Sequence, residues 1–290
     1  MLIVQKYGGT SVGNTERIDA VANRVIESKK AGHDLVVVVS AMSGETNKLL
    51  EYAAYFSDTP NQREVDMLLS SGERVTSALL AIALEAKGYP AVSMSGRRAG
   101  IVTDSVHTKA RIEHIDTSGM EEELKCGKII VVAGFQGVTE SGEVSTLGRG
   151  GSDLSAVAVA GALKADLCEI YTDVDGVYTT DPRIEPKAKK LEKISYDEML
   201  ELASLGAKVL QSRSVEMAKK LNVNLVTRSS FNHNEGTLIT KEDNIMEQPL
   251  VSGIALDKNQ ARVTLRGVTD KPGIAAEIFK KLADCNVNVD

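Results

Sequence analysis

The sequence contains no tryptophan, and aromatic residues make up only 4% of its 290 positions. Aliphatic and small side chains must therefore fill the interior, and a hydrophobic share of 42% is sufficient for a substantial core. Cysteine is also scarce. Cys126, Cys168 and Cys285 are far apart and odd in number, so they fit neither a disulfide framework nor a C-x-x-C metal site. We expect them to be structural filler in a reducing compartment.

Long apolar runs are missing as well. No stretch approaches 18 consecutive apolar residues, and the first residues turn polar too early for a signal peptide. A cytoplasmic location is therefore expected. Positive charge is not in excess either, because the net charge is −6. This balance argues against nucleic acid or an anionic membrane as the main partner.

The two common nucleotide-binding fingerprints are also absent. The chain has no G-x-x-x-x-G-K-[ST] sequence, and its glycine-rich loops do not match G-x-G-x-x-G. The first absence excludes a Walker-type phosphate loop. The second argues against an NAD-dependent oxidoreductase, which the α/β pattern alone would allow.

A glycine-rich turn, KYGGTSVG, occupies residues 6–13, between an apolar strand start and an amphipathic helix. Backbone N–H groups and the positive end of a helix make such a turn an anion site. Gly8 and Gly9 allow close approach of a ligand, Ser11 offers a hydroxyl, and Lys6 brings a positive charge. The alternative is an ordinary strand-to-helix turn with a surface lysine.

A second loop of this kind, TLGRGGSD, spans residues 146–153, after a hairpin through Gly142. The helix that follows is built from small residues and can lie close to a sheet. Ser152 or Asp153 suits its N-cap position. Two glycine-rich helix entrances suggest two anionic groups that face each other.

Strand-like and helix-like segments alternate along the chain. Residues 36–39, 129–133 and 167–172 read as buried strands, and residues 63–87 and 195–203 read as helices. The pattern predicts an α/β fold, a three-layer αβα sandwich with a mostly parallel central sheet. Ligands are expected beyond the carboxyl ends of the strands.

The character of the chain changes near residue 245, which divides it into residues 1–245 and 246–290. A polar linker is followed by a predicted strand at 261–266, a helix at 274–284 and the start of a strand at 287–289. The second part thus predicts a partial βαβ segment.

Six motifs in order closely resemble the aspartokinases, members of the amino acid kinase family. They are KYGGTSVG (6–13), SAMSGETN (40–47), SSGER (70–74), TLGRGGSD (146–153), YTDVDGVYTTDPR (171–183) and SLGAKVLQ (204–211). The resemblance implies the amino acid kinase fold for residues 1–245. Residues 246–290 resemble the first βαβ of an ACT regulatory domain, which would be incomplete here. Family members tend to associate through ACT domains. A homo-oligomer is therefore possible, but its association is expected to be weakened by the incomplete ACT region.

The resemblance also implies a reaction. ATP would phosphorylate the β-carboxylate of L-aspartate to give 4-phospho-L-aspartate, the first step of lysine, threonine and methionine synthesis. Mg²⁺ would be held mainly by ATP oxygens and water. The acceptor carboxylate has a solution pKa of about 3.9, so no general base is needed. The four histidines lie outside the motifs and are expected at the surface.

Roles for individual residues follow from the resemblance. Those implied to be catalytic are Lys6, Asp153 and Lys208. Those implied to bind aspartate are Ser40, Thr46, Glu73, Arg149 and Ser152. Those implied to bind the nucleotide are Lys6, Gly8, Gly9, Ser11, Thr172, Asp173, Tyr178, Asp181, Arg183, Lys208 and Val209. No protein metal ligand is implied.

Other functions stay open at this point. Another amino acid kinase, acting on acetylglutamate, glutamate, uridylate or carbamate, would share the fold and the lysine–glycine start. A sensor that binds nucleotide or amino acid without turnover would share the loops. The presence of both Lys6 and Lys208 with Asp153 favours catalysis, because a binding module needs no charge focused on a transferring phosphoryl group.

Overall fold

The computed structural model describes residues 1–205, 209–242, 253–256, 264–268 and 271–284. The chain forms two compact units, Met1–Leu256 and Asp257–Asp290. In the second unit, helix α8 (Ile274–Asp284) has the bounds that the sequence predicts. The predicted strand at 261–266 is not seen in its described part, because residues 264–266 are irregular. The predicted strand at 287–289 and the predicted boundary at 245 lie outside the described residues.

An eight-stranded sheet forms the centre of the first unit, in the order β10-β12-β11-β9-β1-β2-β6-β3. The pair β11 and β12 is antiparallel and the other neighbours are parallel, so the predicted mostly parallel sheet is confirmed. The strands are β1 (Leu2–Tyr7), β2 (Asp34–Val39), β3 (Ala91–Met94), β6 (Ile129–Ala133), β9 (Leu167–Thr172), β10 (Lys193–Ser195), β11 (Leu225–Ser229) and β12 (Thr237–Thr240).

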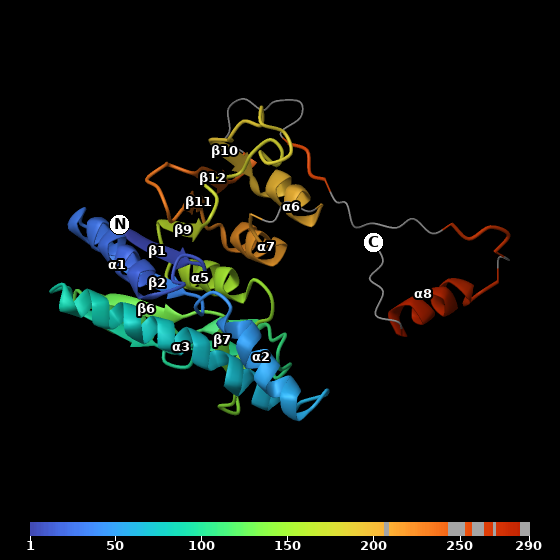
Figure 1. The fold of residues 1–290 in the computed structure, drawn as a ribbon, viewed down its shortest axis with the longest axis horizontal. Helices are drawn as coiled ribbons and strands as arrows, with labels where there is room; N and C mark the ends of the chain where they lie inside the picture. Colours follow the sequence, from blue (N-terminus) through green and yellow to red (C-terminus); the bar gives the residue numbers. More distant parts are fainter. Residues whose placement is uncertain (206–208, 243–252, 257–263, 269–270, 285–290) are drawn as a thin grey trace. The chain divides into compact units, whose positions relative to one another are not determined.

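Helices cover both faces of this sheet (Figure 1). In β2, Val37 and Val39 pack with α1 (Thr15–Lys30) and α3 (Gln62–Ala86), whereas Val36 and Val38 belong to the core on the opposite face. The helices of that opposite face are α4 (Ser118–Lys125), α5 (Gly151–Ala162), α6 (Tyr196–Ser204) and α7 (Ser212–Leu221). Since successive residues of a strand point to opposite faces, the all-valine run of β2 builds both cores. The three-layer αβα architecture is confirmed.

A second sheet of four short strands was not predicted. Its order is β5 (Ile112–Ile115), β4 (Ile101–Thr103), β7 (Gln136–Thr139) and β8 (Val144–Thr146). The sequence indicated only the hairpin through Gly142, which joins β7 to β8. The pairing of β4 with β7 joins residues far apart in the chain, and strands of three or four residues leave little alternation to detect.

Helix α3 is unusually long and apolar for a helix of this unit. Among the described residues it is the one helix long and apolar enough in composition to cross a membrane, and half of the apolar window is buried inside the protein. Its buried face carries two acidic residues, Asp66 and Glu73, and packs against the central sheet. It is therefore a core helix. The remaining helix of the unit, α2 (Glu45–Phe56), packs against it.

The start of α5 differs from the prediction. The N-cap is Gly150, at φ 71°, and no side chain caps the helix. Ser152 and Asp153 lie instead in the first turn, so the predicted capping role is wrong. Glycine adopts this left-handed conformation without the penalty that a side chain would incur, and the polar side chains remain available.

The two-sided core makes a test of stability possible. Ile130 of β6 is fully buried, and Ile130→Ala should lower the free energy of unfolding by about 2–5 kcal/mol because it leaves a cavity. The matched control is Ile82→Ala on α3, where the side chain is 61% exposed and the change should stay within about 0.5 kcal/mol. Urea titration measures both. Equal losses would contradict the packing described here.

Candidate active site

Four neighbouring parallel strands end at the same edge of the sheet. Backbone hydrogen bonds run from Gly8 N to Tyr171 O (3.3 Å), from Ser40 N to Tyr7 O (3.1 Å) and from Gly134 N to Val39 O (3.0 Å). Segments that follow β1, β2, β6 and β9 therefore meet along one line. This is the place at which ligands of open α/β sheets bind.

Lys6 and Asp153 meet at this edge. Lys6 Nζ lies 2.6 Å from Asp153 Oδ1, and the two side chains are only 11% and 13% exposed. Lys6 comes from β1, and Asp153 comes from the first turn of α5. The two glycine-rich loops that the sequence singled out are thus neighbours in space, and the N-terminus of α5, which has no side-chain cap, brings the positive end of the helix to the same point.

The loop after β1 is closely packed. A Cβ on Gly9 would lie 3.0 Å from Ala41 O, and one on Gly8 would lie 3.3 Å from Lys6 Nζ. Ser11 is fully buried, and its hydroxyl donates to Ser230 Oγ at 2.8 Å. Its role is therefore partly to fix the loop.

Ser230 was missed by the sequence analysis. Its hydroxyl also donates to Thr172 O at 3.2 Å, so it ties the glycine-rich loop to the end of β9. The pairing of β11 with β9 would reveal it. The two strands are parallel, Ser229 pairs with Thr172, and residue 230 therefore follows β11 at the same edge of the sheet.

Glu73 lies on the buried face of α3 and is 4% exposed. Its Oε1 accepts a hydrogen bond from Ala41 N at 3.1 Å, whereas Oε2 is buried and has no partner among the described residues. Burial raises the pKa of this carboxyl from 4.5 to about 7, although the Ala41 N–H opposes the shift. Gly72 permits this contact, since a Cβ there would lie 2.8 Å from Ala41 Cβ.

The other residues implied to bind aspartate surround the same edge. Ser40 follows β2, Thr46 lies in the first turn of α2, and Ser152 is buried beside Gly134. Arg149 is exposed, in a loop whose flanking glycines have φ of 75° and 71°. The structure thus places an exposed cation, Arg149, at the rim and the buried hydroxyl of Ser152 deeper in the site.

The loop after β9 is held by bonds among its own residues. Tyr178 Oη donates to Asp175 Oδ1 at 2.9 Å, and Thr172 Oγ1 donates to Asp173 Oδ1 at 3.0 Å. Arg183 donates from Nε and Nη2 to both oxygens of Asp181, at 3.0 and 2.8 Å.

The loop between α6 and α7 is described only in part. Lys208 lies outside the described residues. Val209, which follows it, is half-buried at the start of the described stretch that leads to α7. The implied role of Lys208 therefore stays a prediction.

The comparisons with known proteins identify the family of this chain. The sequence profile of the amino acid kinase family matches residues 1–228. An aspartokinase of Helicobacter pylori strain J99 is 65% identical over 294 residues, which cover 100% of this chain and 73% of the relative. The chain belongs to the amino acid kinase family, in its aspartokinase branch. The predicted resemblance is confirmed for the kinase part, and the ACT-like character of residues 246–290 stays a prediction.

Solved structures of this branch have the same fold. An aspartate kinase from Synechocystis is 45% identical with a TM-score of 0.75, and the alignment covers 100% of this chain and 49% of that one. Aspartokinase III from E. coli, in complex with aspartate and ADP, is 26% identical with a TM-score of 0.77, over 100% and 76% of the two chains. The fold and the family therefore make this chain an ATP-dependent kinase.

The raised pKa of Glu73 predicts a dependence of stability on pH. Between pH 4.5 and about 7 the folded protein binds a proton that the unfolded chain has lost, so its stability falls as the pH rises through this window. Glu73→Gln removes this loss. The ligand-free variant should gain stability relative to the parent at pH 8, by up to about 3 kcal/mol, and gain little at pH 5. Urea titrations at both pH values measure this, and an equal difference at the two would contradict it.

Proposed function

We propose that the chain transfers the γ-phosphoryl group of ATP to the β-carboxylate of L-aspartate, giving ADP and 4-phospho-L-aspartate. The observation that carries this proposal is the pairing of two charged features across Ala41. On one side is the unpartnered, buried carboxylate oxygen of Glu73, which suits an ammonium group. On the other side lies the glycine-rich loop with Lys6 and Asp153.

Recognition of aspartate needs opposite charges for its two ends. Glu73 would accept the α-ammonium, which would also return its carboxyl to the ionised form. Arg149 would take the α-carboxylate with its planar fork, and its exposed position lets it reach a substrate from the rim. The hydroxyls of Ser40, Thr46 and Ser152 would complete the site. The complex of aspartokinase III with aspartate and ADP supports this choice of substrates.

Phosphoryl transfer requires mainly positioning and neutralisation of charge. Lys6, the glycine-rich loop and the positive N-terminal end of α5 would stabilise the negative charge that spreads over the transferring group. Lys208 would add a second cation. Asp153 would hold the Lys6 ammonium in place and would not take a proton, because aspartate attacks as a carboxylate.

The nucleotide would lie between the glycine-rich loop and the loop after β9. Thr172, Asp173, Tyr178, Asp181, Arg183 and Val209 would surround adenosine and phosphates, with Gly8, Gly9 and Ser11 opposite. The described residues contain no group of three or more His, Cys, Asp or Glu that could hold a metal ion. As the family resemblance implies, Mg²⁺ would be held mainly by phosphate oxygens and water. A cytoplasmic location is part of this proposal, and association of copies stays a prediction.

The reaction can be tested directly. ADP should form only when ATP and L-aspartate are both present, and hydroxylamine should trap the acyl phosphate as a hydroxamate. Acetylglutamate, glutamate, uridylate and carbamate should give no such product. If ADP formed with one of these acceptors and not with L-aspartate, the chain would have the activity of another amino acid kinase and the proposed substrate would be wrong. Binding of ATP and aspartate without ADP formation would indicate a sensor.

The role of Lys6 predicts a specific kinetic change. Lys6→Met should lower kcat by on the order of 10²-fold or more while KM for ATP changes little, because the charge acts chiefly in the transition state. Lys6→Arg should also fail, since a planar fork cannot replace a compact ammonium. The matched control is Lys29→Met, which removes a lysine paired with Asp34 at 3.0 Å at the far end of α1. Near-normal kcat in Lys6→Met would contradict the assignment.

A further inference from the structure

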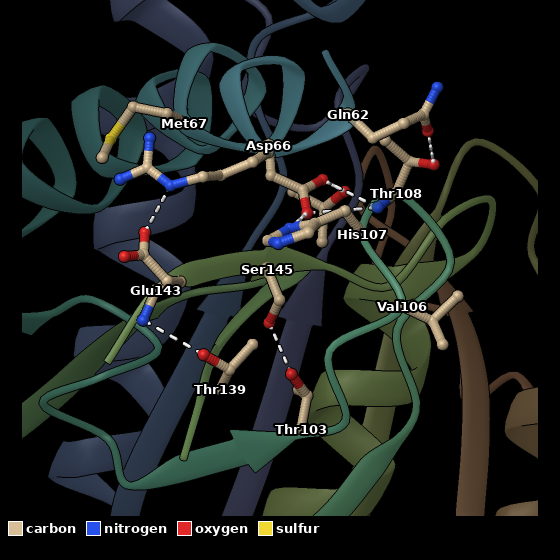
Figure 2. A network of polar contacts seen from close by, with 12 residues as sticks. Gln62, Asp66, Met67, Thr103, Val106, His107, Thr108, Thr139, Glu143 and Ser145 are labelled. Atoms are coloured by element: carbon tan, nitrogen blue, oxygen red, sulfur yellow. Dashed lines mark hydrogen bonds and ion pairs between the residues drawn. The ribbon is translucent and has the colours of Figure 1, made fainter. Parts of the chain in front are cut away.

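A second buried carboxylate on α3, Asp66, gathers two loops around itself (Figure 2). It is fully buried. Oδ1 accepts hydrogen bonds from Thr108 N at 3.0 Å and from the Thr146 hydroxyl, and Oδ2 lies 2.7 Å from His107 Nδ1. Three donors from two chain segments thus converge on one side chain. His107, expected at the surface, is instead only 19% exposed.

We infer that Asp66 is a positioning residue for the recognition of aspartate, an inference that rests on the function proposed above. Thr146 is the last residue of β8, and only two residues lie between it and Arg149. Leu147, which follows Thr146, is fully buried. The bond from Thr146 to Asp66 therefore fixes the root of the loop that presents Arg149.

Helix α3 connects both halves of the proposed aspartate site. Asp66 and Glu73 are seven residues apart, which is about two turns, so they lie on the same face of one helix. Glu73 would contact the ammonium group directly, whereas Asp66 acts through the loop of Arg149. A single rigid element then sets the separation between the two charges that recognise the substrate.

The loop of residues 104–111 is the second segment that Asp66 fixes. Thr108 has φ of 63°, an unfavourable conformation for a β-branched residue, and its N–H is bonded to both oxygens of Asp66. Its carbonyl faces Gly148, where an added Cβ would lie 3.1 Å away. The strained turn at Thr108 therefore packs against Gly148, the residue that precedes Arg149.

Arg213 of α7 ties the same two segments from another helix. Its Nη1 donates to Leu147 O at 2.8 Å and its Nη2 donates to Ala110 O at 3.4 Å. Ala110 N in turn donates to Thr146 O at 2.9 Å. With Asp66 removed, Arg213 would still hold the loop, so we expect its geometry to loosen and not to collapse. None of these bonds involves Lys6 or the segment after β9.

The experiment separates positioning from general stability. Asp66→Asn keeps the shape but removes one acceptor oxygen, and it should raise KM for aspartate by about 10-fold while KM for ATP stays within about 2-fold. Thr146→Val removes a single donor to the same carboxylate and should shift KM in the same direction, which keeps a test available if Asp66→Asn does not fold. The matched control is Glu85→Gln, an exposed carboxylate on α3.

A double-mutant cycle tests whether Asp66 acts through Arg149. In an Arg149→Ala background, Asp66→Asn should raise KM for aspartate much less than in the parent. An equal fold-change in both backgrounds would overturn the inference, and so would a lower melting temperature with unchanged KM. Turnover of the parent is measured first, so absence of aspartate-dependent ADP formation there would count against the proposed function and not against the role of Asp66.

Discussion

The ion pair of Lys6 and Asp153 is the contact on which the arrangement of the site depends. Two nearly buried charges are costly unless they are paired, so the pair constrains both elements that carry it. The first strand and the start of α5 are thereby held together although they are distant in sequence. The positive N-terminal end of α5 and the glycine-rich loop are then close together, an arrangement that suits an anionic group.

Helix α3 carries two buried carboxylates, Glu73 and Asp66, in different surroundings. Glu73 is buried with one carboxylate oxygen unpartnered among the described residues. Its pKa is raised because burial disfavours the ionised form. In contrast, Asp66 on the same helix is fully satisfied by donors from two loops. One helix thus carries a buried carboxylate with an unpartnered oxygen and another whose two oxygens are both bonded to nearby loops. The local sequence around the two residues does not distinguish these roles, because burial and partners come from distant segments.

Much of the framework was predictable. The runs at 36–39, 129–133 and 167–172 are strands because they are apolar and β-branched, and α3 and α6 lie within one residue of their predicted bounds. The start of α5 was predicted wrongly, because a glycine in a left-handed conformation replaced the expected side-chain cap. His107 was expected at the surface and Ser230 was overlooked, because the side chain of each acquires its partner from a residue more than forty positions away in sequence.

The sequence by itself determined the family, the layered fold and the identity of the motif residues, because periodicity and glycine placement are local properties that act within one element. Only the tertiary structure decided which of these residues meet. The register of β1 with β2 and β9 places the loops at one edge, and the burial of α3 sets the environment of Glu73. Pairing and desolvation depend on neighbours brought together by the whole fold, so no local pattern could specify them.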